Sequence, residues 1–229
     1  MLDMIHQHGK DFRVAFSISG VFLEQLEQYA PEVIDVLQQL SETGCVEFLA
    51  EPYSHGLSSL VNTECFINET KRQMRKMKEL FGHTPKVLRN SSLIYNDEIG
   101  AIVANMGFKG MMVEGAKHIM GWRSPHYVYS CAQDSRLSLL MRDYKLSDDI
   151  SLRFSDSSWS EYPLMADKYV GWISSLPEGE DVINIMMELS AFGIYQPLSS
   201  NILEFFRAIP DMAAKLGVKF ATPSEVISK

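Results

Sequence analysis

Apolar segments alternate with amphipathic or capped segments along this whole chain of 229 residues. The apolar runs predict strands at residues 13–19, 45–50, 86–88, 108–113, 137–146, 181–189 and 218–221. Between them, apolar residues at spacings of three and four, or capping residues with a closing glycine, predict helices at 22–40, 63–80, 96–106, 164–176 and 199–216. Such alternation is typical of a parallel sheet with crossover helices. The sequence therefore predicts an α/β fold.

The number of strand–helix units favours a barrel over an open sheet. Six or seven units, with nearly continuous apolar strands, predict an incomplete, distorted (β/α)7-type parallel barrel. The chain contains no GxGxxG or P-loop motif, which disfavours a nucleotide-binding sheet. Its length suits one domain over residues 1–229. The longest irregular stretch, residues 114–133, is too long for a plain connector and is expected to cover the functional site.

Composition excludes several classes of protein. Hydrophobic residues make up 46% and charged residues 22%, as in soluble globular proteins, and the net charge of −8 argues against a nucleic-acid partner. No apolar run has the length of a membrane span, and the first residues lack a signal-peptide pattern, so we expect a cytoplasmic protein. Cys45, Cys65 and Cys131 lie far apart, which fits reduced thiols. The six histidines show no ligand-like pairing, so we expect no metal and no other cofactor.

Polar side chains follow several of the predicted strands, where barrel enzymes place their chemistry. These strand-end residues are Glu47, Glu51, His55, Arg89, Asn90, Ser92, Glu114, Asp148, Asp149, Glu188 and Ser190. The aromatic residues expected around them are Trp122, Tyr127, Trp159 and Tyr195. Sugars stack their apolar faces on aromatic rings and hydrogen-bond their hydroxyls to carboxylates and amides. The pattern thus suits a polyhydroxylated ligand.

Three motifs resemble those of glycoside hydrolase family 57, the α-amylase and glucanotransferase family. Residues 44–55 (GCVEFLAEPYSH) resemble one family motif, and residues 89–95 (RNSSLIY) resemble the motif that holds the nucleophile. Residues 146–154 (LSDDISLRF) resemble the motif that holds the acid/base. Phe192-Gly193 with Gln196 is what remains of a further one. The resemblance runs from about residue 12 to residue 228 and is closest to the α-amylase-type branch.

The resemblance implies a retaining mechanism at α-glucosidic bonds, with a glutamate nucleophile and an aspartate acid/base roughly 5–5.5 Å apart. The aspartate falls on Asp149, with Asp148 as a one-residue alternative, but the glutamate falls on Ser92. A serine is neutral, shorter than glutamate, and needs a base that no adjacent histidine supplies. Loss of the nucleophile removes several powers of ten in rate. The other candidates are expected to bind substrate: Glu47, Glu51, His55, Arg89, Asn90, Trp122, Asp148 and Glu188.

The chain departs from the family at two further places. In residues 187–196 (MELSAFGIYQ), Ser190, Ile194 and Tyr195 stand where the family has polar or charged residues. The family's first strand, with its His-Gln-Pro motif, is expected before residue 1, and its helical region after residue 229. A barrel without its first strand has an unpaired edge, or open seam. We therefore expect an α-glucan or maltooligosaccharide ligand with little or no hydrolysis.

Two other functions stay open from the sequence. One is an active α-amylase or 4-α-glucanotransferase in which another carboxylate, Glu188 or Glu51, is the nucleophile. The other is a non-enzymatic protein that pairs with an active paralogue, or with a second copy, through the open seam. Glu47 fits either a ligand site or a structural ion pair, because a half-buried acid needs a partner. Trp122 fits either the core or a sugar-stacking platform.

Overall fold

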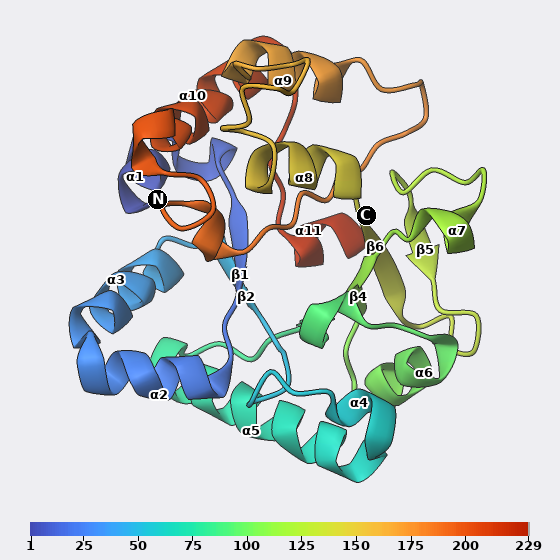
Figure 1. Cartoon of the computed structure of the whole chain (residues 1–229). Coiled ribbons are helices and arrows are strands. Elements are labelled where there is room, and N and C mark those ends of the chain that lie inside the picture. Colours follow the sequence, from blue (N-terminus) through green and yellow to red (C-terminus); the bar gives the residue numbers. More distant parts are fainter. Residues whose placement is uncertain (229) are drawn as a thin grey trace. The chain divides into compact units, whose positions relative to one another are not determined.

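The computed structural model describes residues 1–228 and confirms the α/β class (Figure 1). The chain divides into two compact units. Unit 1 comprises Met1–Glu114, Val128–Leu140 and the C-terminal residues from Ala221, and unit 2 comprises Gly115–Tyr127 and Met141–Phe220. No helix in residues 1–228 combines the length and apolar character that a membrane span requires.

The strands of unit 1 are mostly parallel and do not close into a barrel within the described residues. The strands are β1 (Val14–Ser17), β2 (Val46–Leu49), β3 (Val87–Arg89), β4 (Gly110–Glu114), β5 (Val128–Ser130) and β6 (Ser138–Arg142), of which the last two residues of β6 belong to unit 2. β1 pairs with β2, and the second sheet has the order β3-β4-β6-β5 with β5 antiparallel to β6. Ala50 links the two sheets, because its N–H and C=O bond to Val87 O and Arg89 N at 2.9 and 2.8 Å. Parallel pairing brings the C-terminal ends of β1, β2, β3 and β4 to one edge.

Helices cover the strands of unit 1 (Figure 1). They are α1 (Leu2–His8), α2 (Gly20–Tyr29), α3 (Pro31–Glu42), α4 (Ser58–Val61), α5 (Thr63–Phe81), α6 (Asp97–Asn105) and α11 (Pro223–Ile227), with 3-10 turns at Gly9–Asp11 and Ser91–Leu93. The amphipathic α5 buries Phe66, Met77 and Phe81. Phe81 stacks on Phe48 of β2 with ring centroids 4.4 Å apart. This packing fixes the end of β2 from which the loop at residues 50–57 leaves.

Unit 2 is built around an aromatic core. Its helices are α7 (Lys117–Met120), α8 (Tyr144–Ser151), α9 (Ala166–Ser174) and α10 (Ile202–Lys215), with 3-10 turns at Leu189–Ala191 and Leu198–Ser200. Leu146 and Ile150 of α8 are buried in one cluster with Tyr169 of α9 and Phe205 of α10. Tyr169 also donates its hydroxyl to Leu146 O at 3.0 Å. Because one face of α8 is held in this core, the positions of its polar residues are fixed.

The structure corrects several predicted boundaries. The helix expected at residues 22–40 is two helices, because Ala30 leaves helical geometry with φ −152° and Pro31 starts α3. The strand expected at residues 137–146 ends at Arg142, and Asp143 caps α8 through a hydrogen bond from Leu146 N at 2.8 Å. The N-cap residues of α5 and α10 are Asn62 and Asn201.

Two predicted strands are not strands in the described chain. Residues 181–189 make only an isolated parallel bridge, from Asn184 to Arg142, and residues 218–221 make no ladder. Both segments pack their apolar side chains, among them Ile183, Ile185 and Val218, against the core of unit 2. Burial against helices satisfies the same apolar pattern that a buried strand would show, so periodicity alone could not separate the two.

Candidate functional site

Asn90 shapes the turn that follows β3. Its side chain is fully buried, and both its oxygen and its nitrogen are hydrogen-bonded. Its Oδ1 accepts from Ser91 N at 2.9 Å, and its Nδ2 donates to Ser59 Oγ and Ile94 O, both at 2.9 Å. These bonds close the turn and tie it to α4. The part of Asn90 in ligand binding stays a prediction, and the observed contacts are those of a loop-shaping residue.

The same turn presents Ser92 in an unusual backbone conformation. Ser92 is exposed and has φ 52°, and the buried Leu93 next to it has φ 55°. His55, in the loop after β2, has φ 53°. Among the described residues only Asn201 joins these three as a non-glycine residue with positive φ. Each such residue costs about 1–3 kcal/mol, and such strain concentrates at functional sites. In unit 1 the non-glycine residues with positive φ lie in the two loops at the C-terminal ends of β2 and β3.

Glu51 is the centre of a polar cluster beside that turn. Only 2% of its side chain is exposed. Ser17, at the end of β1, donates its hydroxyl to Oε2 of Glu51, and Arg89, at the end of β3, lies 3.7 Å from the same oxygen. Nδ1 of His55 lies 3.1 Å from Oε1. The structure therefore brings together three predicted site residues, Glu51, His55 and Arg89, and Arg89 anchors a carboxylate.

Glu47 contacts the C-terminal helix of unit 1. Its Oε2 accepts from Ser224 N at 2.8 Å, and its Oε1 accepts from the Ser224 hydroxyl. Ser224 lies in the first turn of α11, where unpaired N–H groups and the helix dipole favour an anion. The geometry thus supplies the partner that a half-buried acid needs. A ligand-binding role for Glu47 stays a prediction.

In unit 2, both predicted aspartates of α8 pair with arginines. Asp148 is partly exposed, and its Oδ1 lies 2.5 Å from Nη2 of Arg142. Asp149 is 2% exposed and accepts from Nε of Arg153 at 2.7 Å. Burial raises the pKa of the Asp149 carboxyl above its ordinary 3.8, and the hydrogen bond from Arg153 opposes that shift. The role of Asp149 as the acid/base, with Asp148 as its alternative, stays a prediction.

Two further predicted residues of unit 2 are exposed. Trp122 follows α7 and is 95% exposed, so it is not a core residue. Glu188 is exposed, and the only hydrogen bond to its side chain among the described residues comes from the Ser190 hydroxyl at 3.1 Å. Tyr195, on the turn after Ser190, is 55% exposed. Exposed aromatic rings can stack on sugars, so the aromatic residues stay available for that role.

The sequence analysis missed a buried histidine in unit 2. His126 lies between two carboxylates, with Nδ1 2.5 Å from Glu180 Oε2 and Nε2 2.8 Å from Asp143 Oδ2. The cluster joins the loop at residues 115–127 to the N-terminus of α8 and to the segment before Asn184. Asp143 directly follows a strand and could have been found by its position. His126 and Glu180 carry no such local signal.

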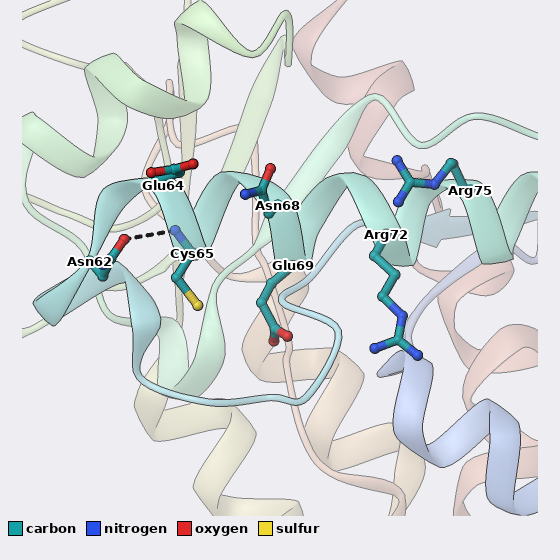
Figure 2. A pocket seen from close by; sticks show the side chains of 7 residues that line it. All are labelled: Asn62, Glu64, Cys65, Asn68, Glu69, Arg72 and Arg75. Carbon is teal, nitrogen blue, oxygen red and sulfur yellow. Dashed lines mark hydrogen bonds between the residues drawn. The ribbon is translucent and has the colours of Figure 1, made fainter.

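An open groove lies on the surface of α5, and both acidic and basic side chains line it (Figure 2). It has a volume of about 560 Å³ and is lined by Asn62, Glu64, Cys65, Asn68, Glu69, Arg72 and Arg75. Glu69 accepts from Ser54 N at 2.9 Å, and Arg72 pairs with Glu24 at 3.1 Å. These contacts are typical of a solvated helix face. No cluster of three or more His, Cys, Asp or Glu within residues 1–228 could hold a metal ion.

Comparison with known proteins identifies the family. The family model for glycosyl hydrolase family 57 matches residues 2–229. The chain is 42% identical over 231 residues to a Methanocaldococcus jannaschii protein provisionally named an alpha-amylase, covering 100% of this chain and 48% of that protein. The chain thus spans about half the length of this relative.

Solved structures share the fold at low identity. The 4-alpha-glucanotransferase of Thermococcus litoralis superposes with a TM-score of 0.78 and 16% identity, covering 100% of this chain and 35% of that chain. The GH57-type branching enzyme of Pyrococcus horikoshii superposes with a TM-score of 0.73 and 12% identity, covering 100% of this chain and 63% of that chain. With the family model matching nearly every residue, the chain belongs to glycosyl hydrolase family 57.

Proposed function

We propose that this chain binds an α-glucan or maltooligosaccharide and hydrolyses it very slowly or not at all. The observation that carries the proposal is the exposed hydroxyl of Ser92 in the turn after β3, within the segment that resembles the family's nucleophile motif. The relatives are described as an alpha-amylase and a 4-alpha-glucanotransferase, which supports an α-glucan as the ligand class.

Serine is a poor substitute for the glutamate nucleophile. A hydroxyl carries no charge to offset the positive charge that develops on the sugar ring, and it needs a base to become nucleophilic. Within residues 1–228, no histidine or carboxylate hydrogen-bonds Ser92. The loss of a covalent nucleophile costs several powers of ten in rate, which leaves a binding protein.

An active enzyme with another nucleophile is the alternative, and the geometry disfavours both candidates. Oε2 of Glu51 receives Ser17 and lies near Arg89, and its Oε1 faces His55, so neither oxygen is free to attack. Glu188 is exposed at the N-cap of a 3-10 turn, where water weakens the field of its charge.

Maltoheptaose tests the proposal. We expect the chain to bind this sugar in calorimetry and to release no reducing ends above a buffer blank. The variant Ser92→Glu restores the missing charge, and Ser92→Gln is the matched control with the same length and no charge. A gain of turnover in Ser92→Glu alone supports the proposal. Turnover by the unmodified chain that Asp149→Asn or Glu51→Gln abolishes would refute it.

A further inference from the structure

The contact between Glu51 and His55 decides which ring nitrogen of His55 carries a proton. An ionised carboxylate oxygen only accepts hydrogen bonds, so Nδ1 of His55, at 3.1 Å from Oε1, has to donate. In a neutral imidazole the other nitrogen is then an acceptor. The contact with Glu51 therefore leaves Nε2 with a bare lone pair.

That lone pair belongs to a side chain in contact with solvent. The side chain of His55 is 42% exposed, and no group within residues 1–228 hydrogen-bonds Nε2. The φ of 53° at His55 places the residue in a conformation that costs free energy. The contact with Glu51 orients the ring, with Nδ1 on the buried carboxylate and Nε2 without a hydrogen-bond partner among residues 1–228.

Glu51 cannot itself reach a ligand, because only 2% of its side chain is exposed. Its charge is balanced locally by Arg89, at 3.7 Å, and its second oxygen is occupied by Ser17. The acceptor that the cluster offers is thus Nε2 of His55, and the charge of the Glu51 carboxylate beside the ring is balanced by Arg89. An acceptor of this kind matches a hydroxyl donor better than an ion.

We propose that Glu51 is a positioning residue and that Nε2 of His55 accepts a hydrogen bond from a hydroxyl of a neutral carbohydrate. This inference rests on the proposed function and assigns one ligand contact within it. Glu51 acts only through His55, by fixing its tautomer and ring orientation, as carboxylates do for metal-bound histidines. Arg89 and Ser17 hold Glu51 in place.

Two substitutions separate the ligand contact from the contact with Glu51. In His55→Asn the amide nitrogen takes the place of Nδ1 and can still donate to Glu51, but nothing reaches the place of Nε2. In His55→Gln the amide group reaches the place of Nε2. We expect His55→Asn to bind maltoheptaose about tenfold more weakly at an unchanged melting temperature, and His55→Gln to bind within about threefold of the parent chain.

The tautomer is measured without any ligand. Nitrogen-15 NMR of the histidine rings, at about pH 8.5 where an ordinary imidazole is neutral, is expected to show a protonated Nδ1 and a bare Nε2 for His55. A protonated Nε2 would overturn the inference. Equal maltoheptaose affinity for His55→Asn and the parent chain would also overturn it and leave the proposed function standing. Failure of the parent chain to bind the sugar would overturn both.

Discussion

Replacement of Asn90 by alanine is expected to destabilise the chain because one buried side chain closes the turn that carries Ser92. The substitution removes hydrogen bonds to Ser91 N, Ser59 Oγ and Ile94 O, each 2.9 Å long. Ser91 is 1% exposed, so water cannot fully replace the partner of its N–H. The turn then also loses the restraint that holds Ser92 at positive φ.

The magnitude follows from these contacts. Three hydrogen bonds at about 1 kcal/mol each, with about 1 kcal/mol more for the unpaired N–H of Ser91, give a loss of about 4 kcal/mol. Relaxation of the positive-φ residues returns about 1–2 kcal/mol of strain. The net loss in the free energy of unfolding is therefore about 2–3 kcal/mol, which for a chain of this size lowers Tm by about 5–10 °C.

Urea unfolding followed by circular dichroism measures this loss. Asn68→Ala is the matched control, because Asn68 is exposed on α5 (Figure 2) and alanine favours a helix. We expect the control to change the free energy of unfolding by less than about 0.5 kcal/mol. If Asn90→Ala lost no more than the control, Asn90 would not be what maintains the turn, and the account of how Ser92 is presented would be wrong.

Three further predictions concern charged groups. Glu47→Gln weakens the contact with Ser224 by about 1 kcal/mol, so hydrogen-exchange protection in residues 223–227 falls; unaltered protection would contradict this. Burial raises the pKa of Asp149, so the folded chain holds a proton that the unfolded chain releases, and the stability that Asp149 contributes is present in acid and lost as pH rises. The free energy of unfolding of the parent chain, relative to that of Asp149→Asn, should therefore be highest below pH 3.8. A difference between the two that does not vary with pH would count against this. His126→Ala leaves the carboxylates of Asp143 and Glu180, 10% and 15% exposed, without their shared partner and should cost about 3–5 kcal/mol in urea unfolding, so a cost near zero would show that the cluster is not stabilising.

Much of the site was predictable as a set of residues. A polar side chain just after an apolar strand is visible in the sequence, and parallel strands necessarily end at one edge of their sheet. This reasoning found Glu51, His55 and Arg89, which the structure joins in one cluster. It could not find His126, because its two partners come from segments 17 and 54 residues away.

The sequence by itself determined the alternation of apolar and amphipathic segments, the α/β class and the serine in the nucleophile-like motif, because periodicity and motifs are local properties of the chain. Tertiary structure decided which apolar segments became strands, since Ile183 and Val218 bury equally well against helices. It also decided the partner of each acid. Glu47 bonds to Ser224, 177 residues further along the chain. A carboxylate takes whichever donor the fold brings within about 3 Å, and sequence spacing does not specify that donor.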